Sequence, residues 1–356
     1  MAELNASEGP EPEVSAELLA MSEFDPQALS HVVSGAEFEH RRLSGGGSRI
    51  DLLQCCLPHS VLNRGVYAPA VLVTGTFAKE AITIGTMLQQ QDSTILNGST
   101  VQMGTVQIYT EGSEMCYRAW PNATWLAFVI SREQLHDYCA QHLDYVPSVP
   151  TSGVVSINPQ DRRSGDRLLA ALRDLDGSLR SLSRLPNAAR VGESIEHDLL
   201  ARIAGFLGRR PHVQASGDRR RVRLCGQILR DTIALVERNP TEMLDLHSMS
   251  KATGLSPRTL QRTFQAEYGL SPQGWLRVER LNRVRADLLD PGQERSVTQT
   301  ATRWGFFHLG RFSQYYRQLF GERPSATSAR RAATHSTRTF EFSLSRSSNG
   351  GRADLS

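Results

Sequence analysis

The sequence predicts an α+β protein with two main parts, a β-rich front half followed by an all-helical back half. The chain has 356 residues, which is long enough for two domains of ordinary size, and its apolar fraction of 39% supports buried cores. The pattern of apolar residues also changes along the chain, from the short alternating runs of strands to the three- and four-residue spacing of helices.

Short β-prone runs separated by Gly, Asn, Ser or Pro occupy residues 36–130. Several alternate apolar and polar residues, as in "STVQMGTVQIYTEG", and a small barrel or sandwich is the expected result. Residues 131–207 then predict helices. Ser131 is a suitable N-cap for "SREQLHDYCAQHL", and two longer helices are expected at 160–184 and 188–207.

Three other segments have the composition of irregular chain. Residues 1–25 are acidic and rich in Glu, Ala, Ser and Pro, so a disordered N-terminus is expected. Residues 208–219, "GRRPHVQASGDR", resemble a linker in composition. The Ser-, Arg- and Gly-rich residues 332–356 are expected to form an unstructured tail.

The net charge of +3 hides an asymmetry along the chain. Residues 217–330 carry a net charge of +8, whereas residues 1–216 carry −7. An acidic front and a basic back indicate nucleic acid as a partner of the back half alone. Lys79 and Lys251 are the only lysines, and a genome's codon bias would explain that use of arginine without any function.

Several classes of protein are disfavoured by what the sequence lacks. It has no run of 18 apolar residues, so no membrane span is expected, and its N-terminus does not read as a secretory signal. Its five cysteines have no CxxC spacing, which fits a reducing cytoplasm. Because we find no Gly-rich phosphate loop, nucleophile elbow or other catalytic constellation, we expect neither an enzyme nor a cofactor.

A helix-turn-helix pattern occupies residues 245–268. "DLHSMSKATG" predicts a short first helix that ends at Gly254, a residue able to adopt the left-handed turn conformation. Leu255 follows as an anchor, and Ser256 and Pro257 suit the N-cap and first position of a second helix. In this pattern the second helix enters the major groove and reads bases near its N-terminal end.

The pattern is repeated at residues 297–320. "VTQTATRWG" predicts the first helix with Gly305 at the turn, and Phe306 is the anchor. The second helix buries Phe312 and Leu319. Between the two units, "SPQGWLRVERLNRVRADLLD" predicts a helix that starts at Ser271 and Pro272 and runs for about eighteen residues, or about 27 Å. This length suits a strut that holds two reading helices in successive major grooves about 34 Å apart.

The segments "LSPRTLQRTF", "SPQGWLRVERLNRVRADLL" and "RWGFFHLGRFSQYYRQLFGERPS" resemble the DNA-binding domain of the AraC/XylS family of bacterial transcription regulators. The resemblance covers about 220–331, roughly a third of the chain. It implies seven helices, two helix-turn-helix units and binding to one face of bent DNA at an asymmetric site. Double-stranded promoter DNA and RNA polymerase are the partners that this family implies.

The resemblance also assigns roles to outward-facing residues. Gly310 matches a reading position of the second helix but has no side chain to read with. Arginine pairs naturally with guanine, and glutamine with adenine. The candidates for base reading are Arg258, Gln261, Arg262, Arg311 and Gln314, and the candidates for phosphate contact are Thr259, Gln265, Tyr315 and Arg317.

The front half is similar, more loosely, to the cupin-like sensor domains of ethanolamine-utilisation-type regulators. Such a domain is a small β-barrel that binds an effector, followed by helices that dimerise, here residues 160–207. No histidine lies between His59 and His136, so the metal-binding pattern of cupin enzymes is missing from the strands and no metal is expected. Candidates for lining an effector pocket are Tyr67, Trp120, Trp125 and Phe128, and core packing is the alternative for each.

These observations predict a transcription regulator, an activator that responds to a small-molecule effector. Three alternatives remain open: a general DNA-binding protein, an enzymatic cupin with an attached DNA-binding domain, and a constitutive regulator whose barrel binds no effector.

Overall fold

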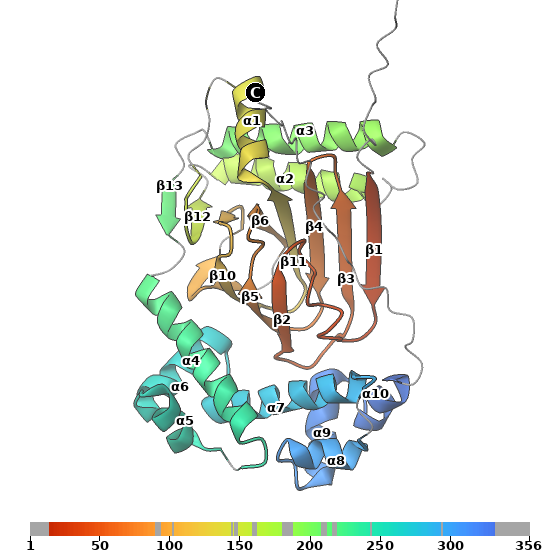
Figure 1. Ribbon diagram of the computed structural model, residues 1–356, viewed down its shortest axis with the longest axis vertical. Helices are drawn as coiled ribbons and strands as arrows, with labels where there is room; N and C mark the ends of the chain where they lie inside the picture. The colour runs from red at the N-terminus through yellow and green to blue at the C-terminus, as the bar shows by residue number, and fades with distance from the viewer. Residues whose placement is uncertain are drawn as a thin grey trace, which may run out of the picture.

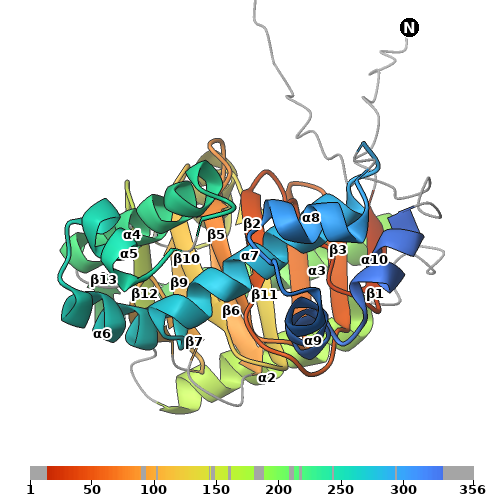
Figure 2. The same cartoon turned by 90° about the horizontal axis from the view of Figure 1, so that it is seen from below.

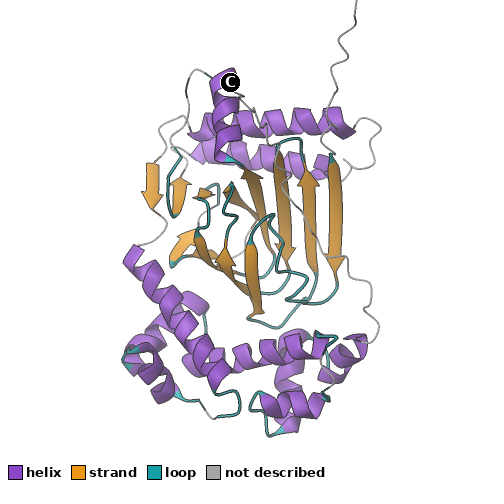
Figure 3. Ribbon diagram, viewed as in Figure 1, coloured by secondary structure: helices purple, strands orange, loops and turns teal. Residues whose placement is uncertain are grey.

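The structure is a computed structural model that describes residues 14–89, 94–101, 103–143, 145, 149–158, 162–179, 188–207, 212–215, 219–242, 244–292 and 295–331. The front half is built mainly from strands and the back half from helices (Figure 1 and Figure 3). None of the helices in these ranges has the length and apolar content that crossing a membrane requires.

The strands form two antiparallel sheets. The larger has eight strands in the order β1 (Ser15–Met21), β3 (Ile50–Cys56), β4 (Ser60–Tyr67), β11 (Ala123–Ile130), β6 (Ile82–Gln89), β9 (Val106–Tyr109), β12 (Val154–Asn158) and β13 (His212–Ala215). The smaller has the order β2 (Glu37–Arg42), β5 (Val71–Thr76), β10 (Glu114–Ala119), β7 (Thr94–Leu96) and β8 (Ser99–Val101). In the described residues neither sheet closes on itself, so the two antiparallel sheets are shown but the closed barrel of a cupin is not.

Strand β11 lies at the centre of the large sheet and is buried along its whole length. Successive side chains of a strand point to opposite faces. Trp125 and Ala127 therefore enter the core between the sheets, whereas Leu126 and Phe128 enter a second core. The helices that cover this second core are α1 (Arg132–His142), α2 (Arg162–Leu179) and α3 (Ala188–Leu207), on the opposite side of the sheets from the C-terminal helices (Figure 1).

Two segments expected to be irregular contain strands. Within residues 1–25, β1 pairs with β3 in an unbroken register from Ser15 opposite Cys56 to Met21 opposite Ile50. Within residues 208–219, β13 pairs with β12. Both form because a partner strand with free backbone groups lies alongside, which composition does not reveal. Residues 1–13, 208–211, 216–218 and 332–356 lie outside the described residues, so the predictions for them stay untested.

The described part of residues 219–331 contains seven helices. Ser256 and Ser271 cap their helices as predicted, and each is followed by a proline in the first turn. The helices are α4 (Arg219–Arg238), α5 (Leu246–Thr253), α6 (Pro257–Tyr268), α7 (Pro272–Leu289), α8 (Val297–Arg303), α9 (Leu309–Phe320) and α10 (Pro324–Arg331). Figure 2 shows α7 crossing beneath the sheets, with α5 and α6 towards one end and α8 and α9 towards the other.

Candidate DNA-binding surface and effector cavity

The first helix-turn-helix unit consists of α5, a tight turn and α6. Gly254 ends α5 with a φ of 68°, in the left-handed conformation that its sequence position predicts. Leu260 and Phe264 of α6 are fully buried. The ring of Phe264 lies edge-on to Trp275 of α7, with 5.6 Å between the ring centroids, and this contact fixes the inner face of α6.

The outer face of α6 carries polar side chains. Arg258, Gln261, Arg262 and Gln265 are all exposed, as the spacing predicts. Thr259 is half-buried, and its Oγ1 lies 2.9 Å from the capping Oγ of Ser256. Four of the five candidates on this helix are therefore free to meet a ligand, whereas the hydroxyl of Thr259 already has a partner at the helix cap.

The second unit repeats the arrangement with α8 and α9. Gly305 has a φ of 79° at the turn. The indole Nε1 of Trp304 donates a hydrogen bond of 2.9 Å to Asp287 of α7, which ties the end of α8 to the strut. Phe306 packs on Phe312 with 5.1 Å between ring centroids, so it acts as the anchor that the sequence predicts.

The outer face of α9 presents Arg311, Gln314 and Arg317, all of them exposed. Tyr315 is half-buried, and the guanidinium of Arg277 on α7 lies 4.6 Å from its ring centroid. This cation–π contact gives Tyr315 a structural partner. A Cβ added at Gly310 would meet nothing within 4 Å, so the first turn of α9 has open space around it.

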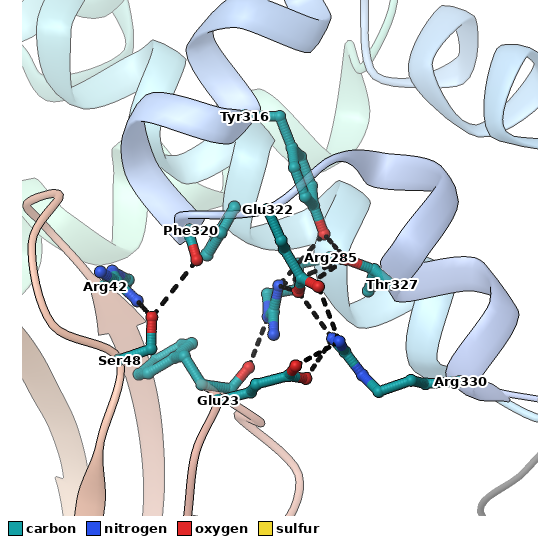
Figure 4. A network of polar contacts seen from close by, with 10 residues as sticks. Glu23, Arg42, Ser48, Arg285, Tyr316, Phe320, Glu322, Thr327 and Arg330 are labelled. Carbon is teal, nitrogen blue, oxygen red and sulfur yellow. Dashed lines mark hydrogen bonds and ion pairs between the residues drawn. The ribbon is translucent and has the colours of Figure 1, made fainter.

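A buried polar network holds the second unit together and joins it to the front half (Figure 4). Arg285 of α7 donates to the Glu322 carboxylate at 2.6 Å, and Arg330 of α10 does the same. Arg285 also donates to the Phe24 carbonyl, and Arg330 pairs with Glu23. Burial alone would raise the pKa of Glu322, but hydrogen bonds from the two arginines lower it to about 2.

The middle of α7 is joined to strand β2 by a buried ion pair that the sequence did not predict. Arg41 Nε donates to Glu279 at 2.7 Å, and the two side chains are 5% and 1% exposed. Burial would lower the pKa of Arg41, but Glu279 and Glu39 raise it above its usual value. Asn282 adds two hydrogen bonds to the Arg42 backbone, one accepted from its N–H and one donated to its carbonyl.

The front half also touches the C-terminal ends of both reading helices. Arg118 and Trp120 lie beside Gly269, the residue that ends α6. Ser48 donates a hydrogen bond to the carbonyl of Phe320, the last residue of α9 (Figure 4). The N-terminal turns of α6 and α9, where a helix-turn-helix reads bases, are at the other ends of these helices.

An apolar cavity of about 60 Å³ lies between the two sheets. Tyr67 and Trp125 line it, as do aromatic and sulfur-containing side chains from both sheets. The other two effector candidates do not. Phe128 points from β11 into the second core beneath α1–α3, and Trp120 lies at the end of α6 under the guanidinium of Arg118.

The cavity has a few polar groups in its wall. Tyr117 Oη donates to Met87 Sδ at 3.0 Å, and Tyr67 Oη lies 3.0 Å from His40 Nε2. The Nε2 of Gln107 has no hydrogen-bond partner although the residue is only 3% exposed. No group of three or more His, Cys, Asp or Glu side chains within the described ranges is placed to hold a metal ion.

Comparison with known proteins identifies the back half. A family model described as a helix-turn-helix domain matches residues 249–330. The chain is 39% identical over 100 residues to XylDLEGF operon transcriptional activator 3 of Pseudomonas putida, and equally so to the probable thc operon regulatory protein of Rhodococcus erythropolis. Each alignment covers 28% of this chain and 30% of the relative, so the chain matches less than a third of the length of these proteins.

Among solved structures, a transcriptional regulator with an AraC-type DNA-binding domain from Chromobacterium violaceum is 30% identical, with 31% of this chain and 96% of that chain covered and a TM-score of 0.28. The turns, buried anchors and exposed polar faces, together with these sequence matches, define residues 249–330 as a DNA-binding domain with two helix-turn-helix units. Residues 249–330 are therefore a helix-turn-helix domain similar to those of XylS- and AraC-type transcription regulators.

Proposed function

We propose that the whole protein is a sequence-specific transcription regulator, an activator whose DNA-binding domain responds to an effector bound in the front half. The observation that carries this proposal is the pair of reading helices. Each has an aromatic inner face, packed on Trp275 of α7 in α6 and on Phe306 of the turn in α9, and an outer face of exposed arginine and glutamine. The homology to transcriptional activators over the same residues supports it.

Base reading is assigned to Arg258, Gln261 and Arg262 on α6 and to Arg311 and Gln314 on α9. These side chains donate hydrogen bonds and are exposed, which suits the acceptors of guanine and adenine in the major groove. Gln265 and Arg317 are proposed phosphate contacts. Thr259 and Tyr315 remain candidates for phosphate contact. We propose that they contribute less to DNA affinity, because each already has a partner within the protein.

The effector is proposed to bind in the cavity between the sheets, in a sensor domain of cupin-like type. Tyr67 and Trp125 support this as lining residues, and the unpartnered Gln107 Nε2 offers a hydrogen bond to a ligand acceptor. No Asp, Glu, Lys or Arg lines the cavity, which favours an uncharged molecule because burying an unpaired charge is costly.

Two strands connect this cavity to the DNA-binding domain. On β2, Phe38 lines the cavity and Arg41 pairs with Glu279 of α7. On β10, Tyr117 lines the cavity and Arg118 lies beside the end of α6. Displacement of either strand by a ligand is therefore transmitted to a helix of the DNA-binding domain within one or a few residues, which is the two-state coupling that an effector requires.

The remaining assignments rest on the family. We propose that the protein acts in the cytoplasm, recruits RNA polymerase, has no catalytic activity, and forms a homodimer through residues 160–207. In α2 and α3 the buried leucines and isoleucines already pack on the large sheet, so a dimer would use the outer sides of these helices. Sedimentation equilibrium of the full chain tests this, and a monomer at micromolar concentration contradicts it.

The test of the function is a footprint of the full-length protein on fragments selected from its own genome, with random DNA as competitor. We expect protection over two adjacent major grooves on one face for each protomer. Protection without sequence preference means a general DNA-binding protein. Specific protection that no candidate ligand alters, with no ligand found in the cavity, means a constitutive regulator.

A further inference from the structure

The start of the second reading helix is apolar and exposed. Phe307 is 59% exposed and Leu309 is 39% exposed, and they flank His308, the residue at the N-cap of α9. Phe306, not Phe307, packs on Phe312 as the anchor of the turn. The exposed ring of Phe307 and the exposed side chain of Leu309 are therefore not needed to fill the core of the second unit.

These two side chains lie where a helix-turn-helix touches bases. The N-terminal residues of the second helix contact base edges in the major groove. Among the four base pairs, only those with thymine present a methyl group there, and an apolar side chain is its natural partner. Gly310 leaves open space beside Leu309, so the edge of a base is able to approach the helix backbone closely.

We propose that the second unit recognises thymine through its 5-methyl group, with Leu309 as the principal contact and Phe307 as its neighbour. The proposal rests on the DNA-reading function proposed above. The first unit has no such feature: Arg258, Gln261 and Arg262 offer hydrogen-bond donors at the corresponding face. The two halves of the site therefore differ in chemistry: both helices offer donors to purine acceptors, and α9 adds an apolar contact for thymine methyl groups.

The surrounding charge favours DNA over a protein as the occupant of this patch. Arg311 and Arg317 are exposed on the same helix, and Arg303 lies at the end of the preceding one. A cluster of cations around a small apolar patch matches a groove lined by phosphates, whose counterions are released when arginines approach.

The experiment replaces thymine by deoxyuridine, which lacks only the 5-methyl group, one position at a time within the groove that α9 protects. Full-length protein is titrated onto each duplex. We expect one or two positions at which the wild type loses affinity about fourfold, the equivalent of about 0.8 kcal/mol for one buried methyl group. In Leu309→Ala the same replacement should cost little, because the partner of the methyl group is already gone. Leu309→Met keeps an apolar side chain of similar length, so it should retain most of the wild-type loss of affinity on deoxyuridine replacement.

Leu224→Ala is the matched control, because Leu224 is 44% exposed on α4, outside both reading helices. It should leave the response to deoxyuridine at the wild-type level. Equal responses in wild type and Leu309→Ala overturn the proposal. So does a Leu309→Ala variant that binds every duplex normally but fails to activate transcription, since the patch is then a protein contact. If the wild type has no preferred site at all, the proposed function itself fails.

Discussion

Arg262 lies on the exposed face of α6, and its neighbours on the helix leave its guanidinium free. Its exposure is what the proposed base-reading role requires, but exposure alone does not distinguish base reading from a phosphate contact. A residue that reads a base discriminates at one position, whereas a phosphate contact weakens binding to all sequences alike.

Replacing Arg262 by Ala should reduce discrimination at a single base position by about 1–3 kcal/mol. Competition binding with every single-base variant of the footprinted site measures this. Arg132→Ala, a change at the start of α1 on the far side of the sheets from the DNA-binding domain, should leave every ratio unaltered. A uniform loss over all variants identifies Arg262 as a phosphate contact. The same series with Arg311→Ala tests the reading role of α9.

His40 shows how burial alters a titratable group in the front half. The ring is 3% exposed, and burial, with a smaller effect from Arg41, lowers its pKa to about 3. The unfolded chain binds a proton near pH 6.5, whereas the folded chain does not until about pH 3. The stability associated with neutral His40 is therefore complete above about pH 6.5 and is lost as the pH falls through this window.

We expect the free energy of unfolding to fall by about 1 kcal/mol for each pH unit below about 6.5, in addition to the contribution of other groups. Urea unfolding of the wild type and of His40→Leu between pH 7 and pH 5 measures it. The slope should be smaller in the variant even if its stability at pH 7 is lower. His136→Gln, at an exposed histidine, should keep the wild-type slope, and equal slopes in all three proteins contradict the assignment.

At the scale of elements, the helix-turn-helix units could be read from the sequence because their signals are local. Caps at Ser256 and Ser271 and left-handed glycines at Gly254 and Gly305 depend only on neighbouring residues, and all four are found as predicted. The exposed faces of the reading helices followed from the same periodicity.

Features that depend on distant partners were missed. Strands β1 and β13 form only because β3 and β12 lie beside them. The Arg41–Glu279 pair joins residues 238 apart in the sequence. Successive side chains of β11 point to opposite faces of the sheet, so Trp125 and Phe128, both candidates for the effector pocket, lie in different cores. Only the packing of the two sheets determines which of these faces has the cavity.

The turn of the second unit gives a prediction with a control a few residues away. In Gly305→Ala, the alanine must adopt a left-handed backbone conformation, and its Cβ lies 3.0 Å from the Pro240 carbonyl oxygen. We therefore expect a loss of stability of roughly 1–2 kcal/mol. Gly310→Ala, within α9 and with open space around it, should instead gain roughly 0.5–1 kcal/mol. Thermal unfolding measures both, and the same sign for both changes contradicts the account.

For the whole molecule, the contact between the halves is uneven. Polar contacts join the second unit to the front half. Glu23 pairs with Arg330, the Phe24 carbonyl accepts from Arg285, and Ser48 donates to the Phe320 carbonyl. On the side of the first unit, a cleft of about 680 Å³ lies between α4 and the small sheet, and the guanidinium of Arg118 at the end of α6 keeps two nitrogen atoms without partners. Burial lowers the pKa of Arg118, against the opposing effect of Glu267.

The ion pair at the centre of this contact gives a prediction about the whole fold. Arg41→Met leaves the buried Glu279 carboxylate with Arg283 as its remaining partner, and we expect a loss of about 3 kcal/mol. Adding Glu279→Leu removes that charge, so the double variant should be more stable than Arg41→Met alone. Denaturant unfolding of Arg41→Met, Glu279→Leu and the double variant measures the coupling energy between the two side chains. A double variant whose loss equals the sum of the two single losses would show that the pair does not interact.

The contact of the front half with the C-terminal ends of α6 and α9 has a consequence for how such a protein changes over generations. The side chains proposed to read bases lie towards the opposite ends of the same helices, away from this contact. Under the proposed function, mutations that retarget the protein to a new promoter need not disturb the response to a ligand, and mutations that tune the response need not alter the target. The two properties are free to evolve separately within one chain.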